Sequence, residues 1–559
     1  MPQQLPNPAR TSGLTATSWF GTAPALPAFE PLRENATADV VVVGAGIAGL
    51  TTAYLLAKQG VQVLVLEYGE LAELASGESG RTTAHLSYAL DEGYPLLESL
   101  YGQDGARLAA DSHRAAIDRI EKIVLAEKID CDFTRLDGYL FLPKGGTHQE
   151  LLDERDAAHR AGCPDVEWLP TAGLVGFETG ECLRWPNQGQ FHILKYLAGL
   201  ATAIVAHGGR ICTRTHVSEV HGGDAARVLT DDGAEVKARK GIVVATNTPF
   251  KDRVVMHTKQ APHRTYVVAA RVPKGSVAKA LYWDTADPYH YIRLQEVEAG
   301  PRGGQVDYDL LIVGGEDHKT GQDEHPEARL RCLEEWVRER FPMVKGFDYR
   351  WSGQVMEPVD GLGYAGRNPL DSDKVYVITG DSGHGMTHGT LGPMIVADLI
   401  QGRDNPWAAL YHPGRVTIKR ESAQEYLKEN LNVALEYAEL LTGGDVKTAD
   451  EIPAGSGAVL RRGITKVAVY RDEQGTTHEC SAICPHLGCV VHWNGLEKSW
   501  DCPCHGSRFS ALGELMNGPA NTGLAPAWCV KLPFLDRRRT APSPFRFQSK
   551  PFASRNAHP

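Results

Sequence analysis

The stretch DVVVVGAGIAGLTTAYLLAKQGVQVLVLE, from Asp39 to Glu67, decides the fold of the first domain. The apolar run Val40 to Val43 indicates a buried strand, and a Gly-x-Gly-x-x-Gly pattern leads from it into an apolar helix. Gly44 permits a tight turn, Gly46 lets the backbone approach a pyrophosphate, and Gly49 lets the helix pack closely on the strand. The stretch therefore predicts a dinucleotide-binding unit.

The two ends of this unit supply charge where a dinucleotide needs it. The helix, with Ala48 in its first turn, presents its N-terminal amides and the positive end of its dipole to phosphate groups. Glu67 ends the second strand, where a carboxylate can hold ribose hydroxyls. A strand, a glycine turn, a helix and an acid in register are much stronger evidence than the glycines alone.

The bulk properties limit the possible classes of protein. A chain of 559 residues is too long for one core, and its 42% hydrophobic and 23% charged residues are ordinary for globular protein. The net charge of −11 disfavours nucleic acid as a partner. The start MPQQLPNPAR lacks the features of a signal peptide, and the apolar run Asp39 to Ala57 is interrupted by glycines. We therefore expect a cytoplasmic protein without a transmembrane segment.

The pattern of apolar runs and turns divides the chain. We predict an N-terminal arm (1–37), an α/β domain with a doubly wound sheet and an inserted α+β substrate region of antiparallel sheet (38–415), a helix and linker (416–457), a small all-β domain (458–540) and a tail (541–559). The predicted helix has apolar residues at helical spacing, which we expect to pack on a core rather than on a membrane: Tyr426, Leu427, Leu431, Ala434, Leu435 and Ala438.

Three further segments identify the nucleotide. SGRTTAHLS (79–87), GIVVATNTP (241–249) and KVYVITGDSGHGMTHGTLGPMIVADLI (374–400), together with the first unit, resemble the D-amino-acid oxidase-like superfamily of FAD oxidoreductases, which includes enzymes that oxidise glycine, sarcosine and dimethylglycine. The resemblance spans about residues 38–412 and implies that the cofactor is FAD.

The resemblance also implies cofactor contacts. Val217 and Ala245 match residues against the adenosine half. The residues expected against the phosphates and flavin are Arg81, Thr82, Thr83 and Ala84, and those at the flavin pyrimidine edge are Gly383, His384, Gly385, Met386 and Thr387. At that edge a helix N-terminus favours the negative charge of reduced flavin.

His85 is the residue with the least settled role. Dimethylglycine-oxidising relatives have a Thr-x-His whose imidazole is bonded to the flavin, and Thr83-Ala84-His85 stands at a comparable place, although the relatives have Trp where Ala84 stands. A covalent link and a non-covalent imidazole near the dimethylbenzene edge both remain open.

The cysteines point to a second cofactor. Of the eleven, Cys131, Cys163, Cys182, Cys212 and Cys332 are scattered, and the others gather near the C-terminus. There, Cys484-x-His486 and Cys502-x-x-His505 offer two thiolates and two imidazoles. This set suits a pair of irons of which one is held by thiolates and the other by imidazoles. Zinc also accepts such ligands, but zinc-finger spacings differ.

The segment around these pairs, including Asn517 to Ala520, resembles the Rieske family and implies a [2Fe-2S] cluster held by Cys484, His486, Cys502 and His505. Cys489 and Cys504 match the disulfide of Rieske proteins in respiratory and photosynthetic complexes; two reduced thiols are the alternative. Ser507 is kept, whereas Phe509 replaces a tyrosine that donates a hydrogen bond to the cluster, so we expect a lower potential.

The two cofactors suggest a route for electrons. Flavin accepts a hydride and can release single electrons to a Rieske centre. We predict oxidation of a C–N bond in an amine or amino acid, with electrons passing from FAD through the cluster to an external acceptor, a protein or quinone, or else to O₂. The alternatives are an electron-transfer module reduced by a partner, and an O₂-using oxidase with a structural Rieske domain. A self-contained ring hydroxylase would need a 2-His-1-carboxylate iron site, which the sequence does not contain.

The substrate-binding residues have weaker sequence signals than the cofactor-binding residues. Amino-acid oxidising relatives carry an arginine after W-x-G-Q; Trp351 to Gln354 match that pattern, but Val355, Met356 and Glu357 follow, and Glu357 would favour a cationic amine. The residues predicted to act on substrate are Tyr291, Arg293, Arg264 and His384, of which the arginines could hold an anion.

Overall fold

The structure is a computed structural model that describes residues 13–23, 27–69, 77–250, 256–297, 306–323, 325–369, 371–417 and 419–527. The predicted tail (541–559), the first part of the arm (1–12) and the predicted end of the all-β domain (528–540) lie outside these ranges.

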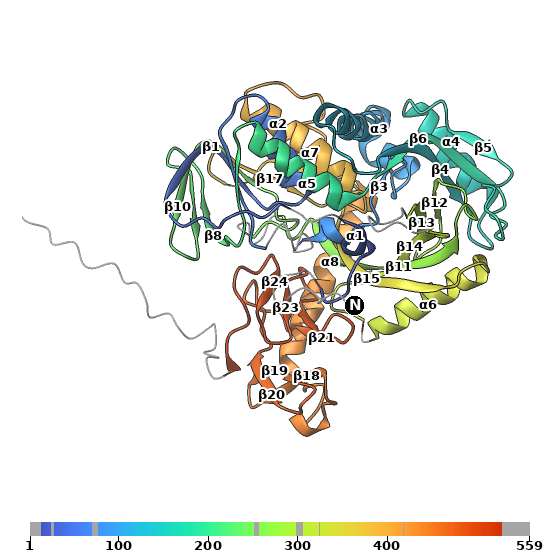
Figure 1. Cartoon of the computed structure of the whole chain (residues 1–559). Coiled ribbons are helices and arrows are strands. Elements are labelled where there is room, and N and C mark those ends of the chain that lie inside the picture. Colours follow the sequence, from blue (N-terminus) through green and yellow to red (C-terminus); the bar gives the residue numbers. More distant parts are fainter. Residues whose placement is uncertain are drawn as a thin grey trace, which may run out of the picture.

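A mainly parallel sheet forms the first domain and confirms the predicted α/β fold (Figure 1). β1 pairs in parallel with β2 and β10, β2 with β7, and β10 with β17; the other strands are antiparallel. The strands are β1 (Ala36–Val43), β2 (Val63–Leu66), β7 (Arg210–Cys212), β8 (Val217–His221), β9 (Arg227–Thr230), β10 (Glu235–Val244), β16 (Tyr364–Arg367) and β17 (Val375–Thr379). Their β-branched runs are buried on both faces, as parallel strands require.

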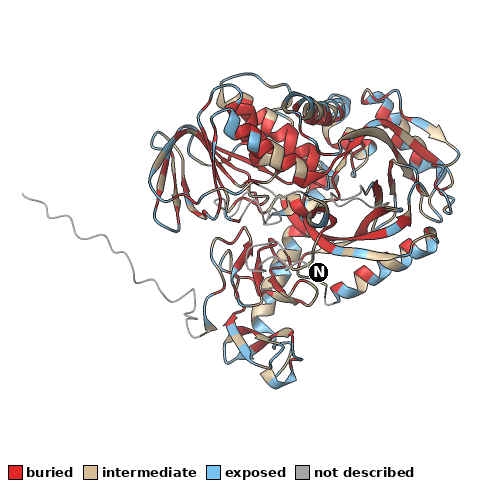
Figure 2. Cartoon of the chain, in the orientation of Figure 1, coloured by how far each residue is buried: buried red, intermediate tan, exposed pale blue. Residues whose placement is uncertain are grey.

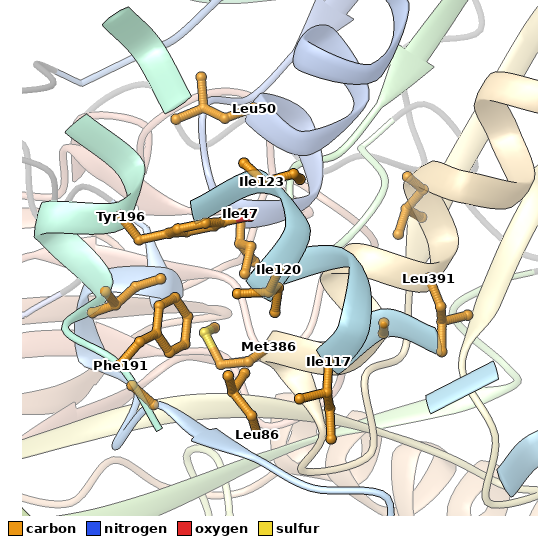
Figure 3. Packing of buried hydrophobic residues seen from close by; sticks show 14 of the residues in the cluster. Ile47, Leu50, Leu86, Ile117, Ile120, Ile123, Phe191, Tyr196, Met386 and Leu391 are labelled. Atoms are coloured by element: carbon orange, nitrogen blue, oxygen red, sulfur yellow. The ribbon is translucent and has the colours of Figure 1, made fainter. Parts of the chain in front are cut away.

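Helices cover this sheet and form the main core. The helices are α2 (Ile47–Ala57), α3 (Tyr94–Glu127), α5 (Ile193–Ala206) and α7 (Gly385–Ile400); α2 contacts α5 and α7, and α3 contacts α7. Figure 2 shows α2 and α5 as largely buried. In Figure 3, Ile117, Ile120 and Ile123 of α3 lie on the face turned toward Ile47 and Met386. This packing fixes the N-termini of α2 and α7 close to one another.

The second layer is a mainly antiparallel sheet, as predicted for the substrate region, with one parallel pair of strands. Its strands are β3 (His85–Leu86), β4 (Thr134–Phe141), β5 (Glu167–Leu169), β6 (Cys182–Gln190), β11 (Gln260–Pro273), β12 (Leu281–Asp284), β13 (His290–Gln295), β14 (Tyr308–Lys319) and β15 (Gly346–Pro358). Helices α4 (His148–Arg160) and α6 (Pro326–Arg340) flank it. Its side chains form one wall of the cavity described below.

The C-terminal domain is all-β, as predicted, and consists of two small antiparallel sheets (lower part of Figure 1). One contains β18 (Ser456–Arg462), β19 (Thr465–Arg471) and β20 (Thr477–Ser481); the other contains β21 (His492–Asn494), β22 (Ser499–Asp501), β23 (Arg508–Ser510) and β24 (Leu515–Asn517). Helix α8 (Arg420–Ala438) and the short helices η4 (Glu439–Leu441) and η5 (Ala449–Glu451) precede it.

Helix α8 departs from its prediction. Leu427, Leu431 and Leu435 are 67%, 57% and 62% exposed, so the apolar stripe does not pack on a core. The opposite face makes the contacts: Asn430 donates to the Thr258 carbonyl, and Tyr437 donates to the Leu487 carbonyl. Val433 and Tyr437 also pack on the core of the C-terminal domain, so α8 makes its contacts through the face opposite its exposed leucines, which the apolar spacing alone does not reveal. No helix in the ranges that the structure describes is long and apolar enough to cross a membrane.

The described part of the arm is also more than an extended segment. It contains α1 (Ser18–Thr22), in which Trp19 is fully buried and donates through Nε1 to the Thr82 carbonyl. Thr15 reaches the C-terminal domain, where its amide and hydroxyl both donate to Glu497. The arm is thus part of the domain interface.

Candidate functional site

One cavity extends from the glycine turn to the antiparallel sheet and collects most of the predicted cofactor residues. Those that line it are Gly44, Gly46, Ala48, Glu67, Arg81, Thr82, Thr83, His85, Val217, Ala245, Gly383, His384, Gly385 and Met386. Three others do not: Gly49, Ala84 and Thr387. Sequence segments far apart in the chain therefore surround one space.

The geometry of the glycine turn fits a dinucleotide. A Cβ at Gly49 would lie 1.9 Å from the Gly44 carbonyl oxygen, so Gly49 acts by close packing rather than by lining the cavity. Gly44 has φ of +102°, which favours glycine. The Ala45 amide donates to Glu67 Oε2 at 2.6 Å and the Gly69 amide to Oε1 at 2.9 Å, so the carboxylate is held at the cavity edge.

A serine that the motif analysis missed completes this turn. The Ile47 amide, in the first turn of α2, donates to Ser79 Oγ at 3.0 Å, and Ser79 lines the cavity. The segment following the second strand therefore folds back over the N-terminus of α2. In the sequence, only the resemblance of SGRTTAHLS (79–87) to the FAD superfamily indicated that Ser79 lies near the glycine turn.

Three predicted residues have other contacts than those expected. Ala84 has φ of +59°, and its carbonyl accepts from Arg293. Thr387 Oγ1 lies 2.8 Å from His113 Nδ1, inside the protein. Arg81 lines the cavity, but Nη1 donates to the Ser352 carbonyl and Nη2 to the Thr15 carbonyl. Its guanidinium group therefore serves the domain interface.

The end of the cavity at the antiparallel sheet is aromatic and polar. Tyr291 Oη lies 2.7 Å from Thr265 Oγ1, and Tyr289 donates to Asp91 Oδ2 at 3.2 Å. His384 Nε2 lies 3.3 Å from Asp91 Oδ1; burial opposes protonation, but the Asp91 carboxylate outweighs it and the pKa of His384 is raised. Trp283, Tyr289 and Asp91 line this end and were not predicted.

The two arginines predicted to bind substrate do not line the cavity. Arg293 Nη1 donates to the carbonyls of Thr83, Ala84 and Phe191, and burial lowers its pKa to about 9. Arg264 is fully buried and donates to Ser352 Oγ. Neither guanidinium group lines the cavity, so neither is placed to hold a substrate carboxylate there. Their partners are distant in sequence, which is why the sequence suggested otherwise.

Glu357, which the sequence suggested would favour a cationic amine, does not line the cavity. Ser382 Oγ donates to it at 3.1 Å. Burial, together with the nearby Glu92 and Asp91, raises its pKa well above the usual range. This raised pKa disfavours the ionised form of the Glu357 carboxyl group.

The C-terminal domain brings its predicted ligands together. The thiols of Cys484 and Cys502 are buried and in hydrogen-bonding contact, and the rings of His486 and His505 lie edge to face with centroids 5.0 Å apart. Two thiols and two imidazoles at one place fit a [2Fe-2S] cluster with thiolates on one iron and imidazoles on the other.

The remaining cysteines and the serine also lie at this place. Cys489 and Cys504 form a disulfide with a Cα–Cα distance of 6.5 Å, so they are not ligands and the reduced-thiol alternative is wrong in this structure. Ser507 contacts the Cys484 thiol and accepts from the Ala520 amide, and Phe509 is fully buried beside the cysteines.

The cluster loops face the first domain rather than solvent. His257 packs edge to face on both predicted ligand imidazoles, with centroids 4.6 Å from His486 and 5.5 Å from His505. Gln354 lines the cavity and donates through Nε2 to the Gly506 carbonyl at 3.1 Å. Neither residue was predicted, because His257 belongs to no motif and Gln354 was noted only as part of W-x-G-Q.

Comparisons with known proteins agree with this arrangement. The family model for FAD dependent oxidoreductases matches residues 39–399, and the model for the Rieske [2Fe-2S] domain matches residues 444–528. A Bacillus subtilis protein named as a Rieske 2Fe-2S iron-sulfur protein, YhfW, is 30% identical over 507 residues, which cover 90% of this chain and 96% of that protein.

Two further relatives match the first domain. The γ-glutamylputrescine oxidoreductase of Escherichia coli is 28% identical over 424 residues, covering 72% of this chain and 95% of that protein. The crystal structure of glycine oxidase from Geobacillus kaustophilus has a TM-score of 0.55 at 20% identity, covering 68% of this chain and all of that one. The second likeness shows the fold.

Proposed function

The chain belongs to the FAD dependent oxidoreductase family and carries a Rieske [2Fe-2S] domain, and from this premise we propose that it passes electrons from the C–N bond of an amine or amino acid through FAD and the cluster to an external acceptor. FAD and a [2Fe-2S] cluster are its cofactors, and it is an FAD-dependent amine or amino-acid oxidoreductase. The cytoplasmic location remains a prediction.

Bound FAD would supply acceptance of a hydride from the carbon next to nitrogen, with the imine product then open to hydrolysis by water, and a bound cluster would supply single-electron transfer. The chain's own groups bind and orient these partners. We assign cofactor binding to the lining residues Gly44, Gly46, Glu67 and Ala245, and cluster binding to Cys484, His486, Cys502 and His505.

Substrate orientation falls to the aromatic end of the cavity. Tyr291 and His384, which were predicted, and Tyr289 and Asp91, which were not, offer hydroxyl, imidazole and carboxylate groups there. Tyr289 and His384 both contact the Asp91 carboxylate, and Tyr291 pairs with Thr265. Arg264 and Arg293 have structural roles instead. The residues that line the cavity at this end include no arginine, which favours an amine over an amino-acid carboxylate as the recognised group.

The contact of the cluster loops with the first domain is the observation that best supports an internal electron route. His257 lies on both predicted ligand imidazoles, and Gln354 joins the cavity wall to Gly506, the neighbour of His505. A purely structural Rieske domain would not need its ligand face against the cofactor cavity. The orientation therefore supports FAD and cluster as successive carriers.

The test is an anaerobic screen of amines and amino acids with the full-length holoenzyme. We expect one substrate to bleach the flavin absorbance and to produce the paramagnetic signal of a reduced cluster. Cys484→Ala should lose iron and acid-labile sulfide, keep FAD and still bleach, but should no longer reduce an added one-electron acceptor. His478→Ala, in the same domain beside Asp472, is the matched control and should behave as wild type.

The alternatives give different results. Peroxide formed in air at equal rates by wild type and Cys484→Ala, with no cluster signal from substrate, would identify an oxidase with a structural Rieske domain. Flavin that no amine or amino acid bleaches, but that is reduced after the cluster, would identify an electron-transfer module. Unchanged iron in Cys484→Ala would refute the ligand assignment.

A further inference from the structure

The C-terminal domain forms part of the wall of the dinucleotide cavity. Residues of β24 and the following turn line the same space as the glycine motif: Leu515, Met516, Asn517, Gly518, Ala520 and Asn521. This wall lies in the part of the chain that the Rieske model matches, and outside residues 39–399, which the FAD dependent oxidoreductase model matches. A cofactor in the cavity therefore meets both domains.

Two asparagine side chains attach this wall to the first domain. Asn517 Nδ2 donates to Glu78 Oε1 at 2.7 Å, and Asn521 Nδ2 donates to the Ser218 carbonyl at 2.6 Å. Glu78 lines the cavity, and Ser218 follows Val217, which also lines it. Both attachments are thus made at the cavity rim rather than elsewhere on the domain surface.

Asn517 has a second feature that points to a ligand. Its Oδ1 is buried, and among the residues that the structure describes it has no hydrogen-bond partner. A buried acceptor without a donor is unfavourable, so native proteins usually satisfy it through protein, water or ligand. The nearest space is a cavity that already has the glycine turn and the acid of a dinucleotide site.

We propose that the FAD site is composite: the Rieske domain contributes residues 515–521 as a wall, and Asn517 Oδ1 accepts a hydrogen bond from bound FAD. Hydroxyl and amino groups of the cofactor are the donors of the right chemistry. By linkage, FAD then strengthens the docking of the Rieske domain by the same factor by which docking strengthens FAD binding. The proposal does not depend on the direction of electron flow.

The first test measures FAD dissociation from full-length variants by the fluorescence of released flavin. Each lost hydrogen bond should weaken binding roughly fivefold. We expect Asn517→Ala, which removes both the acceptor and the attachment to Glu78, to bind FAD about tenfold or more weakly, and Asn521→Ala, which removes only an attachment, about fivefold more weakly. Asn432→Ala is the matched control, because Asn432 pairs with Gln322 away from the cavity, and its FAD affinity should equal that of wild type.

Iron content and the thermal transition are measured on the same samples, so that a misfolded variant is recognised. Wild-type affinity in both Asn517→Ala and Asn521→Ala, with the cluster intact, would overturn the proposal. Equal weakening in the Asn432→Ala control would overturn it as well.

The second test needs no variant. Hydrogen exchange is compared between wild-type protein depleted of FAD and the same protein reloaded with it. We expect FAD to slow exchange in residues 515–521 but not in β19 and β20, which belong to the same domain and do not line the cavity. Exchange in 515–521 that is unaffected by FAD would show that the cofactor does not contact this wall.

Discussion

At the scale of single residues, both ring nitrogens of His85 have hydrogen-bond partners in the protein. Nδ1 lies 2.9 Å from Thr83 Oγ1, and Nε2 lies 3.2 Å from the Ile292 carbonyl oxygen, so Nε2 carries the proton and Nδ1 accepts. Burial, and then the Arg293 charge, lower the pKa of His85 to about 3. The imidazole is therefore neutral, and both nitrogens are engaged with protein.

This arrangement predicts that FAD is bound without a covalent link to His85. A bond from either nitrogen would require one of these two hydrogen bonds to break. Acid precipitation should leave a colourless pellet and a yellow supernatant, in wild type and in His85→Ala alike. Flavin that stays with the wild-type pellet, and leaves it only in His85→Ala, would contradict the prediction.

Residues also show where sequence reasoning reaches its limit. Gly44, Gly46 and Glu67 were predicted because their roles follow from a contiguous motif. Arg293 does not line the cavity, and its Nη1 donates to three backbone carbonyls; no side-chain pattern in the sequence reports a carbonyl that faces an arginine.

At the scale of elements, helices α3 and α4 meet through a buried carboxyl group. Glu154 of α4 accepts from the Tyr94 amide at the start of α3 at 2.9 Å. Burial raises the pKa of Glu154 to about 8, although the Tyr94 amide partly lowers it. The carboxyl group therefore keeps its proton in the folded protein at pH values at which it loses it in the unfolded chain.

The free energy of unfolding therefore depends on pH through Glu154. The folded pKa is about 8 against a reference of 4.5, so the contribution to stability is fully present below pH 4.5 and is lost as the pH rises toward 8. Glu154→Gln has no carboxyl group at this place and should not lose this stability. Between pH 5 and pH 9, the free energy of unfolding of the variant should therefore rise relative to that of wild type by roughly 2–5 kcal/mol. Denaturant unfolding at both pH values measures this.

A matched control for this prediction is Glu150→Gln in the same helix. Glu150 is an exposed residue of the capping box and caps α4 through Thr147. It should change stability by the same amount at both pH values. Parallel pH profiles for wild type and Glu154→Gln would show that this carboxyl group titrates normally.

Contacts within one stretch of sequence could be predicted for the elements, whereas contacts between distant stretches could not. The strand, turn and helix from β1 to α2 are contiguous, so their packing could be predicted. The apolar stripe of α8 was assigned to a core, yet the opposite face, with Asn430, Val433 and Tyr437, makes the contacts to the two domains. The β24 wall joins Asn517 to Glu78 across 439 residues of sequence, and no local pattern encodes such a contact.

At the scale of the whole molecule, four parts of the chain converge on Glu497. Its carboxylate accepts from Thr15 in the arm, from Arg81 at 3.3 Å in the first domain, and from Ser352 in the antiparallel sheet, while Glu497 itself belongs to the C-terminal domain. The side chains of Arg81 and Glu497 are 1% and 0% exposed. Burial alone would raise the pKa of Glu497, but Arg81, Arg508 and Arg264 lower it to about 2.

This junction makes the docking of the domains sensitive to one charge. Glu497→Gln keeps the shape of the side chain but leaves Arg81 buried without its counter-ion, and breaking a buried pair in this way costs about 3–5 kcal/mol. We expect calorimetry to show that the Rieske domain of the variant unfolds separately, below the transition of the first domain, whereas wild type unfolds in one step. Glu479→Gln, which removes an exposed pair with Arg462 in the same domain, should change stability by less than about 1 kcal/mol. If both variants lose the same small amount, the domains are held by their apolar contacts and not by this ion pair.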